Sequence, residues 1–166
     1  MGSARPESVA VKRDPRPFAP VAAERAIPTR HGSVTLEQLA EMQPGMARLM
    51  VEYAQRFWTM YYAAKAGNWP LAGYMHSEMM KLGKVVPVVR PKYAEGMAEF
   101  ERDCMDPLLA AITASDFAAF DVAYRRAIEG SDTFHDRFAK PFIRFRLPPE
   151  PPPLLEMAPD LRPRRE

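Results

Sequence analysis

The placement of the prolines constrains the fold of this chain more than any other feature of its sequence. Of the 18 prolines in 166 residues, five fall in residues 1–33 and eight in residues 141–166, whereas residues 34–140 hold only five. Proline fixes φ and lacks the backbone N–H, so neither end can form a long helix or a central strand. We therefore expect extended Pro-rich arms over 1–33 and 148–166, with the folded part between them.

Charge and composition exclude several classes of protein. The 23 basic and 21 acidic side chains leave a net charge of +2, which argues against a general nucleic-acid binder. No apolar run approaches the roughly 20 residues that span a bilayer. The single cysteine, Cys104, excludes an intramolecular disulfide and any CxxC site. The N-terminal sequence shows no signal peptide, which predicts a cytoplasmic protein, or a periplasmic one if a leader has been removed.

The middle of the chain is predicted to be helical, in four segments separated by helix-ending residues. Gly67-Asn68 ends the first long segment, Pro87 and Pro91 end the second, and Ser115 or Asp116 caps the fourth. Pro107 is expected to kink the third. Short links between four amphipathic helices predict an all-α fold, an antiparallel four-helix bundle within 34–147.

Apolar residues three or four positions apart predict which face of each helix is buried. The first stripe is Met46, Leu49, Tyr53, Phe57, Met60 and Ala64. The second is Leu71, Met75, Glu78, Leu82 and Val85. The third is Tyr93, Met97, Phe100, Cys104, Leu108 and Ile112, and the fourth is Phe117, Phe120, Tyr124, Ala127, Ser131, Phe134 and Phe138.

After Lys140 the pattern changes to a period of two. Ile143, Phe145 and Leu147 alternate with Arg144 and Arg146. This predicts an extended segment over 141–147 with its apolar side on the bundle, or a strand added to a neighbouring chain.

Several motifs in residues 50–147 resemble those of one family. They are Phe57-Trp58, the run Gly67-Asn68-Trp69-Pro70-Leu71-Ala72 followed by Tyr74 and Glu78, then Arg90-Pro91, Asp116-Phe117 and Phe145-Arg146-Leu147-Pro148. In this respect the chain resembles the small helical c-type cytochromes of the cytochrome c′-like kind. The resemblance implies a four-helix fold for a little over half of the chain.

The haem-attachment motif of those cytochromes is altered in this chain. Where the family carries CxxCH, the sequence reads Ser131-Asp132-Thr133-Phe134-His135. The histidine is present and both cysteines are replaced, so the thioether attachment of haem is chemically impossible. The resemblance therefore implies a degenerate, haem-free member in which Phe134 fills part of the space for the porphyrin.

Two candidate cofactor sites remain. His135 could ligate a non-covalent haem or a metal, or could be a partly exposed histidine near a helix end. Met75, His76, Met79 and Met80 form a soft-ligand cluster that suits Cu(I), although methionine more often fills cores or adapts contact surfaces. Cys104 is predicted to be a buried apolar residue, and Glu78 to form a salt bridge at the edge of the core.

The leading functional hypothesis is a non-catalytic, haem-free accessory subunit without a cofactor. Its arms, or a surface of aromatic and basic residues, would contact a protein partner or a second copy of the chain; the surface comprises Trp58, Tyr62, Trp69, Tyr74, Arg144 and Arg146. The alternative is an electron-transfer or storage protein with haem or copper. A third class, a binder of small molecules in the bundle interior, predicts a pocket lined by Phe134, Tyr124 and Trp58.

Overall fold

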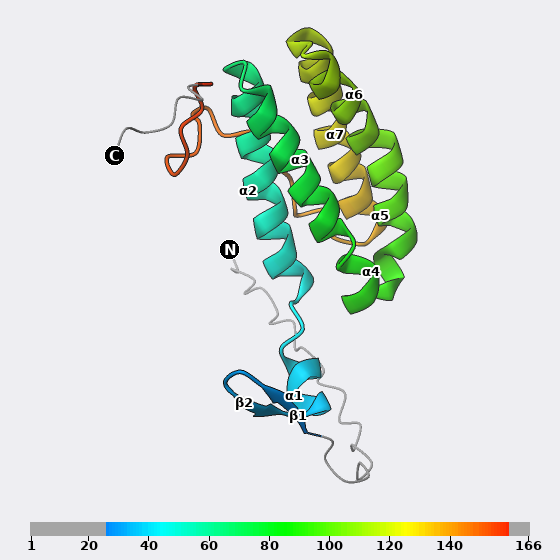
Figure 1. Ribbon diagram of the computed structural model, residues 1–166. Helices are drawn as coiled ribbons and strands as arrows, with labels where there is room; N and C mark the ends of the chain where they lie inside the picture. Colours follow the sequence, from blue (N-terminus) through cyan, green and yellow to red (C-terminus); the bar gives the residue numbers. More distant parts are fainter. Residues whose placement is uncertain (1–25, 160–166) are drawn as a thin grey trace, which may run out of the picture. The chain divides into compact units, whose positions relative to one another are not determined.

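The computed structural model describes residues 26–159, and this part of the chain is mostly helical, as predicted (Figure 1). The chain divides into two compact units, residues 1–43 and residues 44–166, which are described separately below. Within residues 26–159, no helix combines the length and the apolar character needed to cross a membrane.

The first unit contains a small hairpin and a short helix. These are the antiparallel strands β1 (Ile27–Thr29) and β2 (Gly32–Val34), followed by α1 (Leu36–Glu41). Gly32 has a φ of +125°, a conformation that favours glycine. Thr35 caps α1 through its side chain, which accepts a hydrogen bond from the Gln38 N–H. The prediction of an extended arm is therefore wrong for residues 27–33, which belong to a hairpin, and residues 1–25 lie outside the described part.

Helix α2 (Met46–Lys65) begins the second unit and buries the predicted face. Its buried residues include Leu49, Tyr53, Phe57, Met60 and Ala64. The helix ends as predicted, because Gly67 takes the left-handed conformation, with a φ of +76°.

Helix α3 (Trp69–Gly83) is capped by the Asn68 side chain, which accepts a hydrogen bond from the Leu71 N–H. Its buried face is shifted by one position along the sequence from the predicted stripe. The buried residues are Ala72, His76, Met79 and Gly83. The prediction was wrong because it favoured large apolar residues. A small residue lets a neighbour approach closely, and a Cβ at Gly83 would collide with the Glu101 side chain.

The third helical segment is interrupted by a π-helical turn. After α4 (Val86–Val89) and the 3₁₀ turn η1 (Pro91–Tyr93) come α5 (Ala94–Phe100), the π turn η2 (Glu101–Met105) and α6 (Asp106–Ala114). The Asp106 N–H donates to the Glu101 carbonyl, five residues back. The π turn stands immediately before Pro107, which lacks an N–H and would crowd a regular helix, so the wider turn accommodates the proline.

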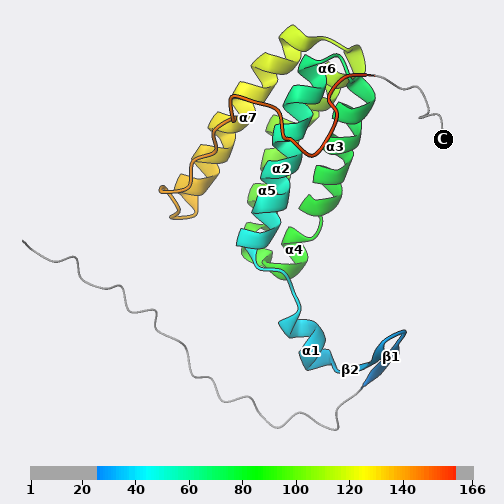
Figure 2. The same ribbon diagram turned by 90° about the vertical axis from the view of Figure 1, so that its left-hand side faces the viewer.

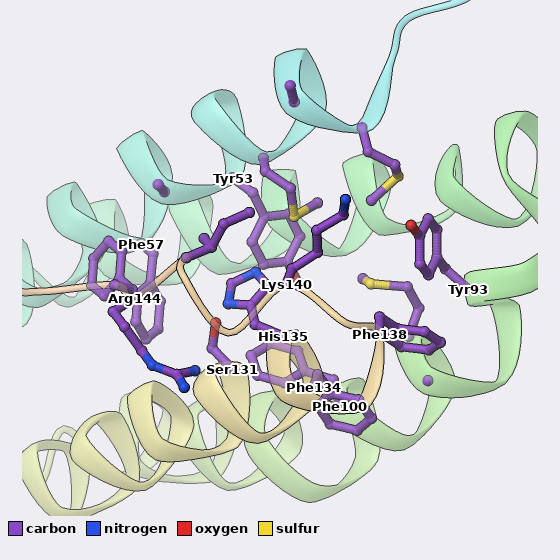
Figure 3. A pocket seen from close by; sticks show the side chains of 18 residues that line it. Tyr53, Phe57, Tyr93, Phe100, Ser131, Phe134, His135, Phe138, Lys140 and Arg144 are labelled. Carbon is purple, nitrogen blue, oxygen red and sulfur yellow. The ribbon is translucent and has the colours of Figure 1, made fainter. Parts of the chain in front are cut away.

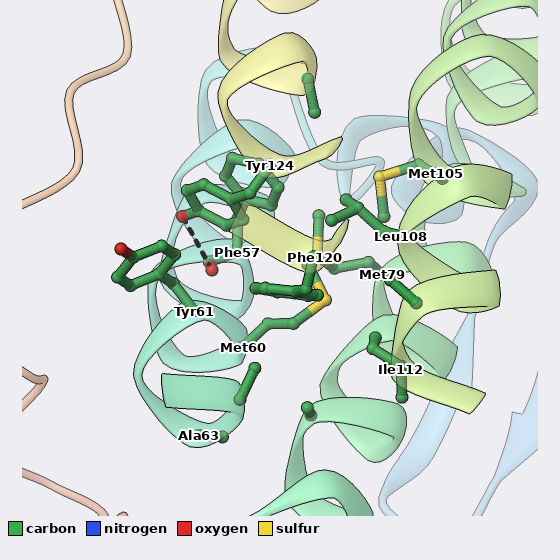
Figure 4. Close-up of a cluster of buried hydrophobic side chains, with 14 of the residues drawn as sticks. Phe57, Met60, Tyr61, Ala63, Met79, Met105, Leu108, Ile112, Phe120 and Tyr124 are labelled. Atoms are coloured by element: carbon green, nitrogen blue, oxygen red, sulfur yellow. Dashed lines mark hydrogen bonds between the residues drawn. The ribbon is translucent and has the colours of Figure 1, made fainter. Parts of the chain in front are cut away.

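Helix α7 (Phe117–Arg137) begins at Asp116, whose side chain accepts a hydrogen bond from the Ala119 N–H. Helix α2 packs on α3 and α7, and α6 also packs on α3 and α7. The core lies between these helices (Figure 4). There the rings of Phe57 and Tyr124 stack with centroids 4.0 Å apart, and the Tyr124 hydroxyl donates to the Phe57 carbonyl at 3.0 Å.

The chain after α7 returns along the helices (Figure 2). We call residues 138–147 the strap and residues 148–159 the tail. The strap contains no strand, but Phe145 and Leu147 pack against the core, as the alternation predicts.

The tail is not a free arm where the structure describes it. Tyr62 donates from its hydroxyl to the Pro148 carbonyl at 2.8 Å, and Trp58 donates from its ring N–H to the Glu150 carbonyl at 2.8 Å. Pro152 and Met157 are buried. A Pro-rich segment has carbonyls without helix or sheet partners, and aromatic donors on α2 satisfy two of them. The expected arm over 148–166 is therefore corrected for 148–159, and residues 160–166 lie outside the described part.

Candidate functional site

A pocket of about 430 Å³ opens between α2, α5, α7 and the strap (Figure 3). Side chains from α2 and from α7 enter it from opposite sides. Most of its wall is apolar. The aromatic lining residues are Tyr53, Phe57, Tyr93, Phe100, Phe134, Phe138 and Phe145, and the thioethers are Met46, Met50 and Met97. The volume and the apolar wall are typical of small-molecule sites.

Close helix contacts position the aromatic wall. A Cβ at Gly96 on α5 would lie 2.9 Å from the Phe138 ring, and one at Gly130 on α7 would lie 2.6 Å from the Cys104 Sγ. Glycine at these two positions lets α7 approach the third helical segment. Cys104 is buried, as predicted, and burial raises the pKa of its thiol.

The strap forms one side of the pocket. Ala139 takes a left-handed conformation with a φ of +56°, and the Lys140 N–H donates to the His135 carbonyl at 2.7 Å, which ends α7. Farther along, Arg144 donates to the Asp132 carbonyl and pairs with Asp136. These contacts bring Lys140 and Arg144 into the pocket lining.

His135 lies in the last turn of α7 and is half-buried in the pocket wall. Its Nδ1 is buried and has no hydrogen-bond partner within the described residues. Burial lowers the pKa of His135, and Arg144 lowers it further, against the opposite effects of Asp132, Asp136 and the Ile143 backbone. The shift favours the neutral imidazole, whose Nδ1 has no partner among the described residues.

Tyr53 is the second lining residue with an unpaired polar atom. Its hydroxyl, from α2, is buried and has no hydrogen-bond partner in the part of the chain that the structure describes. Burial is the main cause of its raised pKa, and Glu101 and Cys104 add to it. A third buried atom without a partner in the described residues is Asp132 Oδ1, one helical turn before His135. Buried polar groups are normally paired, and Tyr53 and His135 both line the pocket, which points to a missing ligand. Sequence reasoning treated Tyr53 only as a core residue, because its spacing fits the apolar stripe.

The pocket lining contains groups that could bind a non-covalent haem, and it contains no cysteine that could attach one covalently. Ser131 and Phe134 line it where thiols would be needed, so thioether bonds cannot form. An unpaired imidazole nitrogen is, however, the usual axial ligand of haem iron. The unpaired Nδ1 of His135, an apolar wall, and Lys140 and Arg144 for acidic substituents are all present.

The predicted soft-ligand cluster on α3 is divided between the core and its margin. His76 is only 4% exposed and Met79 is fully buried, whereas Met75 and Met80 are partly buried. The His76 Nε2 lies 3.0 Å from the Met105 carbonyl, so this nitrogen is the donor and is not free to bind a metal. No group of three or more His, Cys, Asp or Glu residues gathers as a metal site among residues 26–159.

The predicted partner surface is mostly covered by the protein's own chain. Trp58 and Tyr62 bond to the tail, and Trp69 packs edge-on against Phe120 at 6.4 Å. Trp58 and Tyr62 on α2 therefore contact the tail of the same chain. Tyr74, at 58% exposed, and Arg146 remain on the surface, whereas Arg144 lines the pocket.

Glu78 lies at the edge of the core and forms a salt bridge with Lys81, as predicted. The pocket differs from the one expected inside the bundle: only Phe134 of the three expected residues lines it, because Tyr124 lies in the packed core and Trp58 bonds to the tail. Sequence reasoning missed Lys140, whose only signal was its place before the period-two segment.

Comparisons with protein-family models, with curated proteins and with solved structures found no match to this chain.

Proposed function

We propose that this protein is a non-catalytic helical protein that binds an apolar small molecule non-covalently in the pocket between α2, α5, α7 and the strap. The observation that carries the proposal is the pair of buried, unpaired polar atoms, His135 Nδ1 and Tyr53 Oη, in an otherwise apolar wall. Leaving a buried donor or acceptor unpaired costs about 1–3 kcal/mol. A ligand that supplies a partner to either atom recovers part of this energy on binding.

Binding without chemistry suits the groups that line the pocket. General acid–base catalysis commonly needs a second titratable group placed against the reacting atoms. The lining includes His135 but no Asp or Glu side chain. The apolar wall instead favours retention of a ligand, as in a carrier or a sensor.

The test is a binding measurement with a pocket-filling variant. Ala54 lies on α2 and lines the pocket, so Ala54→Phe should occupy ligand space. Ala119 is exposed on α7 and outside the lining, so Ala119→Phe is the matched control. We expect a neutral apolar dye such as Nile red to bind the wild type and Ala119→Phe, and binding to Ala54→Phe to fall about ten-fold or more. Equal binding to Ala54→Phe and Ala119→Phe would show that the dye does not bind in this pocket, which contradicts the proposal.

Non-covalent haem is the second candidate, and it is favoured by the unpaired Nδ1 of His135. Haem would supply an iron centre for electron transfer, His135 would be its protein ligand, and Lys140 and Arg144 would pair with its carboxylates. Haemin titration should give a Soret band with the wild type that is lost in His135→Ala and kept in His76→Ala. A colourless native preparation with no Soret band after titration would retire this candidate. Copper at Met75, His76, Met79 and Met80 has less support, because the His76 Nε2 is already bonded.

We further propose that the four packed helical segments form the antiparallel bundle of a cytochrome c′-like protein that has lost covalent haem. The support is the ring of contacts among α2, α3, α6 and α7, with His135 in the pocket.

An accessory role in a complex is tested by deleting residues 1–33 and by Tyr74→Ala with Arg146→Ala, not by trimming the tail. If all these variants recovered a partner as well as the wild type does, the accessory role through these residues would be rejected.

A further inference from the structure

We infer that the ligand of this pocket is a fatty-acid-like carboxylic acid, whose carboxylate is bound by Lys140 and His135. This rests on the proposed function and names the class of its ligand. Lys140 and His135 line the same pocket (Figure 3). A hydrogen bond from the Lys140 N–H to the His135 carbonyl joins their backbones.

The charges in the pocket lining are all of one sign. Its ionisable side chains, apart from tyrosines, are His135, Lys140 and Arg144, whereas the carboxylates of Asp132 and Asp136 act on His135 and Arg144 from outside the lining. Arg144 is already paired with Asp136 and bonded to the Asp132 carbonyl. Lys140 is exposed and forms no ion pair among residues 26–159, and its ammonium lies 5.6 Å from the centre of the ring of Phe142, which is itself exposed and outside the lining. An anionic group on the ligand would complement this cation at the pocket.

His135 provides the second polar contact for the ligand's head group. Its unpaired Nδ1 donates a hydrogen bond when the proton of the neutral ring is on that nitrogen. A carboxylate accepts from an ammonium and from an N–H, and such charge-assisted bonds are the stronger kind. An alcohol or an ester of the same length could fill the same space but could not neutralise Lys140.

The rest of the wall suits a flexible apolar body. Met46, Met50 and Met97 are unbranched and adapt to irregular shapes, and they line the same pocket as the aromatic rings. The Tyr53 hydroxyl lies close enough to Glu101 and Cys104 for both to raise its pKa. Because Glu101 is acidic, we do not assign this hydroxyl to the binding of an anion. The lining therefore combines a basic head-group site on the strap side with an apolar wall formed with α2 and α5.

The experiment measures displacement of Nile red from the full-length protein by dodecanoic acid and by dodecan-1-ol. Two lysine variants are compared, Lys140→Met in the pocket and Lys65→Met as the control. Lys65 is exposed in the last turn of α2, outside the lining, and its ammonium lies 5.6 Å from the Tyr62 ring, so the control removes the same charge from a similar setting. Because Lys140 is exposed and its charge is screened by solvent, the acid should bind about three-fold to ten-fold more tightly than the alcohol. Lys140→Met should remove this preference and Lys65→Met should keep it.

A second pair of variants tests His135 separately. His135→Asn keeps an N–H donor near the position of Nδ1, and His135→Leu removes it. We expect the acid to bind His135→Asn more tightly than His135→Leu, while the alcohol binds the two variants equally.

The outcomes separate this inference from the proposed function. If acid and alcohol bind equally, or Lys140→Met keeps the preference, the carboxylate inference is overturned while pocket binding stands. If metal-free protoporphyrin displaces the dye and dodecanoic acid does not, the fatty-acid class is overturned in favour of a planar acid. If Nile red itself does not bind, the proposed function fails as well.

Discussion

Two tyrosines of the second unit differ in what their hydroxyl groups contact. The Tyr124 hydroxyl donates to the Phe57 carbonyl at 3.0 Å, whereas the Tyr53 hydroxyl is buried without a partner within the described residues. Both side chains are buried in the same core cluster. The pair therefore separates the effect of an apolar ring from the effect of its hydroxyl.

Removing each hydroxyl should change stability in opposite directions. Tyr53→Phe deletes an unpaired polar atom, so we expect the free energy of unfolding to stay constant or to rise by about 1 kcal/mol. Tyr124→Phe deletes a hydrogen bond and should lower it by about 1 kcal/mol. Urea denaturation of the ligand-free protein measures both. A loss of stability in Tyr53→Phe equal to that in Tyr124→Phe would show that the Tyr53 hydroxyl is bonded after all.

Among the elements, the tail is the one whose structure differs most from what its sequence suggests. Five of its prolines lie between Pro148 and Pro153, and this composition indicates an unfolded arm. Instead the tail covers Trp58 and Tyr62 on α2 and buries its own Met157. It is therefore an integral part of the second unit.

Truncation of the tail should destabilise the protein strongly. A chain that ends after Leu147 loses the hydrogen bonds to the Pro148 and Glu150 carbonyls and the burial of Met157. Two hydrogen bonds at about 1 kcal/mol each and one buried methionine give an expected loss of about 3 kcal/mol. The control ends after Pro159 and keeps all these contacts. Thermal denaturation should separate the two chains, and equal midpoints would mean that the tail does not contribute to stability.

For the whole molecule, stability should depend on pH through two histidines. Burial is the main cause of the lowered pKa of both His76 and His135. The opposing effects come from the Met105 carbonyl and Asp106 at His76, and from Asp132, Asp136 and the Ile143 backbone at His135. Arg144 also lowers the pKa of His135. The unfolded chain therefore binds protons at a higher pH than the folded protein does. Stability is then highest above the ordinary histidine pKa of about 6.5 and falls as the pH drops below it.

Urea midpoints at pH 7.5 and pH 5.5 measure this dependence. We expect a lower midpoint at pH 5.5, and a smaller difference between the two midpoints in His76→Asn and in His135→Asn. His31→Asn, a change on an exposed residue of the hairpin, should keep the full difference. The reverse order of the two midpoints in the wild type would contradict the lowered pKa values.

The two units should contribute unequally to stability. The first unit contains no buried residue between residues 26 and 43, whereas the core clusters lie entirely in the second unit. Deleting residues 1–43 should therefore leave the thermal midpoint of the second unit within about 2 °C of the full-length value, because a change of 1 kcal/mol shifts a domain of this size by about 2–8 °C. A larger fall would reveal a stabilising role for the first unit.

The sequence by itself determined the helical class, most helix ends and the buried face of α2. These features depend on local chemistry: Gly67 ends a helix because it takes a left-handed conformation, and Asp116 begins one because its side chain binds an exposed N–H. Apolar spacing identified the face of α2 because that face carries large residues. The identities of Ser131, Phe134 and His135 were also readable, and they exclude thioether attachment of haem at residues 131 and 134, since covalent chemistry depends on residue identity alone.

Only the tertiary structure decided the buried face of α3, the position of the tail and the pocket. The face of α3 depends on how closely neighbours approach at Ala72 and Gly83, which size-based patterns overlook. The tail is held by side chains about 90 residues away in sequence, such as Trp58 on the Glu150 carbonyl. The pocket arises where aromatic rings from distant elements do not fill the space between α2 and α7. Packing is a property of the assembled helices, and so is the unpaired state of His135 Nδ1.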